Sequence, residues 1–184
     1  MLKRYLILII LILIRNPETR AKFCKKIGLF YEQGERCSFT SFNFGVEPHL
    51  IKIGHNVHLA AGVRFLNHDI VGTLIKNKNN LPFKIRRLGT IVIGNNVFVG
   101  ADAKILYDVN IGSNVIIAAG SIVTKNIPDN SIAAGIPARV VGSFDEYEKK
   151  ILEIVQEYPW YKKDFSLYDK NFIEQQKEYF WKKY

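Results

Sequence analysis

The chain has 184 residues, of which 48% are hydrophobic and 23% are charged, and this composition predicts one globular domain with a sizeable core. The formal net charge is +9, but the basic residues form no stripe with interleaved aromatics and match no nucleic-acid-binding motif, so we predict no nucleic-acid partner. Two cysteines, Cys24 and Cys37, are too few for a disulfide framework. We expect both to be reduced, structural residues of a cytoplasmic protein.

Residues 1–15 combine charge with an apolar run. Met1-Leu2-Lys3-Arg4 precedes an unbroken apolar segment from Tyr5 to Ile14, which Arg15 closes. Ten helical residues cover about 15 Å, roughly half of a bilayer core, so we expect no simple transmembrane span. No small-residue cleavage site follows the run. Three interpretations stay open: burial against the domain or a partner subunit, contact with the inner face of a membrane, and a targeting signal.

A helix is predicted next, over residues 16–28. Asn16 is a suitable N-cap and Pro17 suits the first helical position. Lys25 and Lys26 suit the last turn, and Gly28 suits the C-cap. Residues 1–28 therefore form an apolar segment and a helix ahead of the main domain.

The dominant pattern in the chain is a six-residue repeat. A helix would repeat every 3.6 residues and a half-buried strand every two, whereas a fixed period of six indicates short strands stacked in a parallel β-helix. Large aliphatic residues hold one phase of this repeat and form the expected core column: Ile93, Val99, Ile105, Ile111, Ile117 and Val123.

The same frame extends toward the N-terminus but is interrupted. Ile53, Leu59 and Phe65 keep the six-residue spacing, yet the distance from Phe65 to Ile93 is not a multiple of six. We therefore predict a β-helix over residues 29–142 with an inserted loop at 70–89. Since coils bury their apolar column only against neighbours, the stack must be continuous in space across this loop.

Chemistry is expected where the repeat fails. Asn67-His68-Asp69 stands at that point, and a neutral imidazole flanked by groups that fix its tautomer suits a general base. The other histidines fall at positions that should face solvent. No histidine or cysteine lies at ligand spacing from His68, so we expect no metal site.

Residues 143–184 are predicted to form a helical extension. Ser143 and Glu146 have the spacing of a capping box, and Pro159 should stop the helix that follows. A last helix is expected over about Asp169 to Lys183. Its aromatic residues should pack against the end of the solenoid or a neighbouring subunit.

Three segments of the repeat resemble a known family. The segments Val92–Gly100, Ile117–Asn130 and Ala134–Arg139 are similar to the hexapeptide-repeat acyltransferases, and most of all to the maltose, galactoside and capsular-polysaccharide O-acetyltransferases. The resemblance covers about Gly28 to Tyr147. It implies a left-handed β-helix and a homotrimer with active sites in the clefts between subunits.

The resemblance also assigns roles to residues. His68 matches the catalytic base, with Asn67 and Asp69 beside it, and acetyl-CoA is the implied cosubstrate in a direct transfer to an acceptor hydroxyl. A backbone N–H near Gly100 or Ala101 should meet the oxyanion. Small side chains would admit the pantetheine arm, and polar or basic ones would contact the nucleotide end. The implied coenzyme positions are Gly100, Ala101, Ala119, Thr124, Lys125 and Arg139.

The acceptor is expected to be a cell-surface polysaccharide or its precursor. Glu47 could accept hydrogen bonds from sugar hydroxyls, and Lys84, Arg86 and Arg87 of the loop should wall an acceptor site suited to an acidic glycan. Two alternatives stay open. One is an N-acetyltransferase of a nucleotide-linked amino sugar, and the other is a catalytically silent β-helix scaffold, against which the presence of His68, Lys125 and Arg139 argues.

Overall fold

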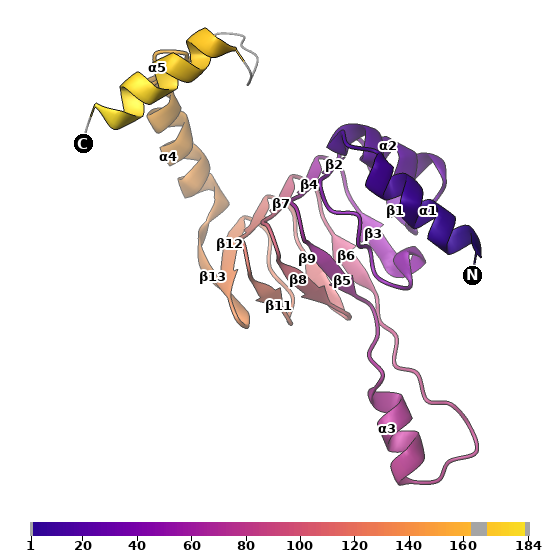
Figure 1. Cartoon of the computed structure of the whole chain (residues 1–184). Coiled ribbons are helices and arrows are strands. Elements are labelled where there is room, and N and C mark those ends of the chain that lie inside the picture. The colour runs from indigo at the N-terminus through magenta and orange to yellow at the C-terminus, as the bar shows by residue number, and fades with distance from the viewer. Residues whose placement is uncertain (1, 163–168, 183–184) are drawn as a thin grey trace. The chain divides into compact units, whose positions relative to one another are not determined.

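The computed structural model describes residues 2–162 and 169–182, and Figure 1 shows the whole chain. It divides into two compact units, Met1–Phe144 and Asp145–Tyr184, which are described separately below. Lys183, the expected end of the last helix, lies outside the described residues.

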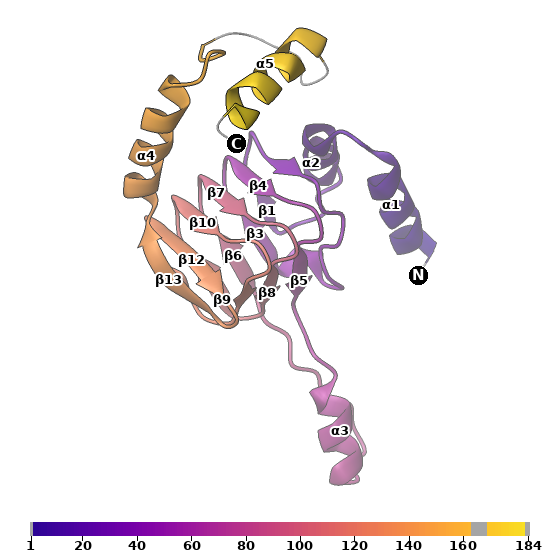
Figure 2. The same ribbon diagram turned by 60° about the vertical axis from the view of Figure 1, so that its left-hand side comes forward.

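Short strands stack into three sheets in the first unit, so that the predicted parallel β-helix is confirmed (Figures 1 and 2). The first sheet contains β1 (Glu32–Gln33), β3 (Ile51–Ile53), β6 (Ile91–Ile93) and β9 (Val109–Ile111). The second contains β2 (Ser38–Phe39), β4 (Val57–Leu59), β7 (Val97–Val99), β10 (Val115–Ile117), β12 (Ser131–Gly135) and an antiparallel edge strand, β13 (Ala138–Ser143). The third contains β5 (Arg64–Leu66), β8 (Lys104–Leu106) and β11 (Ile122–Val123).

The aliphatic column of the repeat is the core of this unit. In the third sheet, Ile105 pairs with Phe65 on one side and with Val123 on the other, and all three side chains are buried. Each such side chain contributes roughly 1.5–3 kcal/mol through burial. Coils thus stabilise one another through the inward positions that the six-residue period marks.

One corner of each coil shows how the coils stack closely. In the turn between β6 and β7, a Cβ on Gly94 would lie 2.7 Å from the backbone of Gly112 in the next coil, so only glycine fits there. At the same corner of successive coils, Asn56, Asn96 and Asn114 adopt left-handed φ angles near +55°, and their side-chain amides hydrogen-bond to one another at 3.0 and 2.9 Å. Asparagine tolerates this conformation better than most residues.

The insertion leaves the stack intact but is not the plain loop that the sequence predicted. Ile53 pairs with Ile93 across it in the same register that joins Ile93 to Ile111. Within the insertion, α3 (Val71–Lys78) forms a helix whose last turn carries Lys76 and Lys78, where cations favour a helix end. Figures 1 and 2 show this segment as an arm that extends away from the coils.

Two helices precede the coils. Helix α1 spans Leu2–Leu13, and α2 spans Pro17–Lys26, where the Asn16 side chain accepts a hydrogen bond from the Thr19 N–H at 2.8 Å as an N-cap. The C-cap is Ile27, one residue earlier than the predicted Gly28, and Gly28 follows it in the left-handed conformation, with φ +60°. Buried side chains of α2 pack in one apolar cluster with the first coil.

Arg20 of α2 is buried, with only 5% of its surface exposed. Its guanidinium donates to the carbonyls of Leu11 and Thr40, each at 2.8 Å, and also to those of Ile14 and Phe39. The carbonyls at the end of α1 have no partner within their own helix. Arg20 therefore joins α1 to the first coil through hydrogen bonds to main-chain atoms.

We predict that both cysteines are inert in the folded protein. Cys24 and Cys37 are free and buried, and desolvation raises the pKa of Cys24 to about 12 and raises the pKa of Cys37 as well. A chromogenic disulfide reagent at pH 8 should not react with the folded protein. After urea is added, two thiols per chain should react and release the chromophore. Because the folded pKa values exceed the unfolded value of about 8.5, the thiols stabilise the fold below that pH and lose this contribution as pH rises further. Rapid reaction of the folded protein would contradict this account.

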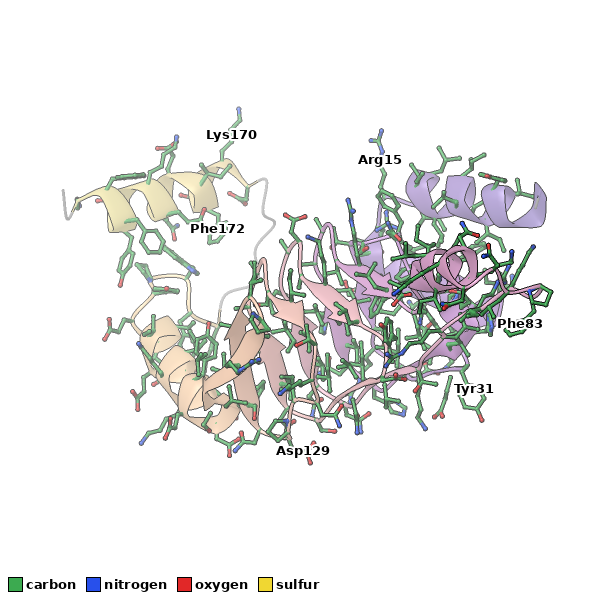
Figure 3. The ribbon with its side chains drawn as sticks, turned by 90° about the horizontal axis from the view of Figure 1, so that it is seen from below. Arg15, Tyr31, Phe83, Asp129, Lys170 and Phe172 are labelled. Carbon is green, nitrogen blue, oxygen red and sulfur yellow. The ribbon has the colours of Figure 1, made fainter. Side chains whose placement is uncertain are left out.

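The second unit contains α4 (Phe144–Gln156, whose first residue belongs to the first unit) and α5 (Lys170–Trp181). Its aromatic residues pack on one another: the Trp160 ring lies 5.5 Å from Phe172 and 5.5 Å from Tyr179, measured between centroids. Figure 3 labels Phe172 on α5. Among the described helices of either unit, none has the length and apolar character needed to cross a membrane.

Candidate active site

His68 lies at the corner that follows β5, where the insertion begins. It forms an isolated antiparallel bridge with Leu88, and the Gly89 N–H donates to the Asn67 carbonyl at 2.9 Å. The insertion therefore leaves and re-enters the coil at one place. His68 lines a cavity of about 500 Å³ together with Glu47, Asp69 and residues of the insertion.

The His68 imidazole is held by a carboxylate. Its Nδ1 lies 2.7 Å from Glu47 Oε2, and the two side chains are 28% and 16% exposed. A hydrogen bond from Nδ1–H to this carboxylate fixes the tautomer and leaves Nε2 as an acceptor. Glu47, which the sequence analysis assigned to sugar hydroxyls, thus has one carboxylate oxygen on the imidazole. This is the arrangement that a general base needs.

Asp69 also lines the cavity, but its hydrogen bonds run elsewhere. Its Oδ2 accepts from the Tyr107 hydroxyl at 2.8 Å, and its Oδ1 accepts from the Val71 N–H at 3.0 Å. The bond to Asp69 is the main cause of a raised Tyr107 pKa, since it favours the neutral phenol. Asp69 therefore joins the insertion to the coil, and Glu47 is the carboxylate that contacts the imidazole.

Asn67 directly precedes His68, but its side chain points into the interior of the coil. Its side chain is buried, with 1% exposed, and it does not line the cavity. Neither polar atom of its side-chain amide has a hydrogen-bond partner among the residues that the structure describes. The structure thus separates Asn67 from its neighbours His68 and Asp69, which both reach the cavity wall.

Gly100, Ala101 and Ala119 occupy equivalent corners of adjacent coils. The Gly100 N–H donates to the Ile117 carbonyl at 2.8 Å, and the Gly120 N–H donates to the Ala101 carbonyl at 2.7 Å. A Cβ on Gly100 would lie 2.5 Å from the Ala119 nitrogen, so this corner requires glycine. Of the two N–H groups expected near the oxyanion, that of Gly100 is already used between coils, and that of Ala101 has no acceptor among the described residues.

Thr124 and Lys125 are exposed and follow β11, in the same sheet as β5. Val123 pairs with Ile105, eighteen residues away, whereas Ile127 pairs with Ile111, sixteen residues away. The corner that carries Thr124 and Lys125 is therefore two residues shorter than the corner that follows β8. It follows β11, which β8 separates from β5 and the His68 corner in the third sheet.

Arg139 lies on the edge strand β13, opposite Ala134, and its guanidinium is exposed apart from a hydrogen bond to the Ala138 carbonyl at 2.8 Å. None of the coenzyme positions predicted from the sequence lines the His68 cavity. One chain thus presents two separate groups: the histidine corner with its cavity, and the small and basic residues of the C-terminal coils.

The insertion supplies cations to the cavity. Lys84 and Arg86 line it as the sequence predicted, and so does Lys76, which sequence reasoning missed because α3 was not foreseen. Arg87 points elsewhere: it lies over the Tyr107 ring at 4.8 Å and pairs with Asp108 at 3.4 Å. Within the described residues, no three His, Cys, Asp or Glu side chains are grouped so that they could hold a metal ion.

Comparison with known proteins agrees with this architecture. A family model described as bacterial transferase hexapeptide (six repeats) matches residues 90–125. Protein CapG of Staphylococcus aureus is 44% identical over 132 residues, which are 70% of this chain and 74% of CapG. The galactoside O-acetyltransferase of Escherichia coli K12 is 39% identical over 114 residues, 60% of this chain, and the match spans about half (53%) of that relative.

A solved structure supports the fold. The hexapeptide-repeat acetyltransferase VCA0836 of Vibrio cholerae matches with a TM-score of 0.56 at 18% identity, over 75% of this chain and 86% of that one. From the repeat, the stacked coils and the similarity to CapG and to the galactoside O-acetyltransferase, we conclude that the chain is an acyltransferase and belongs to the hexapeptide-repeat acetyltransferase family.

Proposed function

We propose that the enzyme transfers the acetyl group of acetyl-CoA directly to a hydroxyl of a saccharide, with His68 as the general base. The observation that carries this proposal is the 2.7 Å contact between Glu47 and His68 at the wall of an open cavity. The name of the galactoside O-acetyltransferase, a 39% identical relative, supports a sugar hydroxyl as the acceptor.

In the proposed step, the acceptor oxygen attacks the thioester carbonyl while its proton passes to Nε2 of His68. The carbonyl π electrons move onto oxygen, where the Ala101 N–H is the donor proposed to stabilise the charge. When the carbonyl re-forms, the carbon–sulfur bond breaks, and the imidazolium returns the proton to the departing thiolate. The products are the acetyl ester and free coenzyme A, and no acyl-enzyme is needed.

The coenzyme is proposed to lie along the C-terminal coils. Ala101 and Ala119 would admit the pantetheine arm, and Lys125 and Arg139 would face the phosphates of the nucleotide. These residues do not line the His68 cavity of their own chain. A homotrimer with a site in each cleft between subunits would bring the two groups together, and we include this assembly in the proposal.

We also propose that the enzyme works at a membrane surface. The outward face of α1 exposes large apolar side chains, including Leu6 and Ile9, which are 57% and 53% exposed. Figure 3 shows Arg15, just after α1, pointing away from the coils. An apolar helical face with a flanking cation suits the boundary between lipid headgroups and acyl chains.

An acceptor screen tests the reaction. Free thiol released from acetyl-CoA would be measured with saccharides that offer only hydroxyls and with amino sugars that offer an amine. We expect release with hydroxyl acceptors. Release only with amines would replace the proposal by N-acetylation, and no binding of coenzyme A would instead indicate a scaffold.

Glu47 is proposed as a positioning residue, and its replacement by Gln should lower kcat by at least about tenfold. The reason is that an uncharged amide no longer stabilises the imidazolium formed during transfer. The KM for acetyl-CoA should change little, and Glu47→Asp should restore part of kcat. Glu18→Gln, at an exposed position on α2, is the matched control. A change in KM alone would contradict the assignment.

A further inference from the structure

An apolar groove of about 620 Å³ lies beside the His68 cavity, between α1 and residues 42–48. Three of its side chains, Leu8, Phe42 and Val46, are 40%, 42% and 45% exposed. No charged side chain lines it in the described part of the chain. Exposed apolar surface of this extent in a concave site is typical of ligand binding.

The groove and the cavity share a wall. Val46 lines both, and the next residue is Glu47, whose carboxylate holds His68. A ligand that fills both spaces would therefore place an apolar part against α1 and a polar part at the imidazole. Such a ligand is an amphiphile with its polar end at the reacting group.

The cavity also offers positive charge. Lys76, Lys84 and Arg86 line it, and none of the three forms an ion pair with an acidic side chain among the residues that the structure describes. The two carboxylates of the cavity, Glu47 and Asp69, are engaged by His68 and Tyr107. Unpaired cations in a cavity that adjoins an apolar groove match an anionic linkage between an apolar chain and a sugar.

We infer that the acceptor is an amphiphilic saccharide, joined to an apolar chain through an anionic, phosphate-type linkage. The chain would occupy the groove, the phosphate would face the cations of the insertion, and the sugar hydroxyl would reach Nε2 of His68. This inference rests on the proposed function and names its substrate class. The exposed apolar face of α1 fits it, since an amphiphile of this kind is held in a membrane.

Binding of n-dodecyl phosphate and n-butyl phosphate to the full chain tests the inference, by calorimetry below the micellar concentration of the longer compound. The longer chain should bind at least about tenfold more tightly, since each buried methylene adds affinity. Leu8→Asn and Phe42→Asn should bring the two affinities together. Leu13→Asn is the matched control, because Leu13 is exposed on the same helix but does not line the groove.

A second pair of variants tests the anionic end. Lys84→Gln should weaken the binding of both phosphates by about threefold or more, whereas Lys78→Gln, on α3 but outside the cavity, should leave it unchanged. Equal affinity of the two phosphates for the unmodified chain would overturn the inference. The inference would also be overturned if Leu13→Asn reduced the affinity for dodecyl phosphate as much as Leu8→Asn does, since the dodecyl group would then lie on the outer face of α1.

A second copy of the protein is the competing occupant of the groove. Association that Leu8→Asn and Phe42→Asn abolish, and that dodecyl phosphate does not displace, would assign the groove to a subunit contact and overturn the inference. The binding assay contains neither acetyl-CoA nor saccharide. Its failure would therefore leave transfer to a soluble hydroxyl acceptor standing, and failure of the acceptor screen would be a separate result.

Discussion

Replacement of His68 by alanine should lower kcat/KM for acetyl transfer by about 10²–10⁴-fold. Without the imidazole, the acceptor hydroxyl loses the base that we propose takes its proton during attack on the thioester, and the thiolate loses the acid that returns it. The side chain is 28% exposed at the edge of a cavity, so the fold should tolerate its removal. Acetylated saccharide, measured by mass spectrometry, gives the rate, and circular dichroism checks the fold.

The matched control is His58→Ala. His58 is exposed on β4, and among the residues that the structure describes its ring bonds only to the side chain of Asn56, at 3.0 Å. This variant should transfer acetyl groups at the rate of the unmodified enzyme. If His68→Ala were as active as His58→Ala, His68 would not be the base.

Replacement of Arg20 by methionine should destabilise the first unit by about 3–5 kcal/mol. The methionine fills similar space but leaves buried carbonyls of Leu11 and Phe39 without a donor. The stability of Arg20→Lys should fall between that of the unmodified protein and that of Arg20→Met, because an ammonium group cannot match the planar fork of the guanidinium. Urea unfolding at a fixed protein concentration measures the difference.

Arg15→Met provides the comparison for this stability prediction. Arg15 lies in the link between α1 and α2 and is exposed, so its replacement should change the free energy of unfolding by no more than about 0.5 kcal/mol. Equal unfolding midpoints for the Arg15 and Arg20 variants would show that the buried guanidinium does not hold α1 to the first coil.

The fold could be predicted from the sequence because a solenoid repeats one local arrangement. The aliphatic column alone indicates stacked coils, and Ile105 between Phe65 and Val123 is buried as that pattern requires. The column of corner asparagines was not predicted, although Asn96 and Asn114 stand one coil apart in the sequence and both have a positive φ. Helix α3 was missed because it stands outside the repeat, where no period marks its faces.

The candidate site was only partly predictable. The interrupted repeat pointed to His68, but not to Glu47 as its partner. One coil spans eighteen residues, as the pairing of Ile91 with Val109 shows, so residues about one coil apart meet at a corner. Glu47 and His68 are separated by roughly that distance along the chain, and this spacing was the available signal. In the homotrimer that we propose, the proposed coenzyme residues would meet His68 of another subunit, and the order of residues in one chain does not specify that assembly.

A single turnover with acetyl-CoA labelled in its acetyl group tests the central proposal most directly. The enzyme would be mixed in excess with labelled acetyl-CoA and a hydroxyl-bearing saccharide, and the label would be followed in protein, coenzyme and sugar. We predict that the label passes to a saccharide oxygen in one step and never appears on the protein. Label on the protein before it reaches the sugar would contradict direct transfer with His68 as the base.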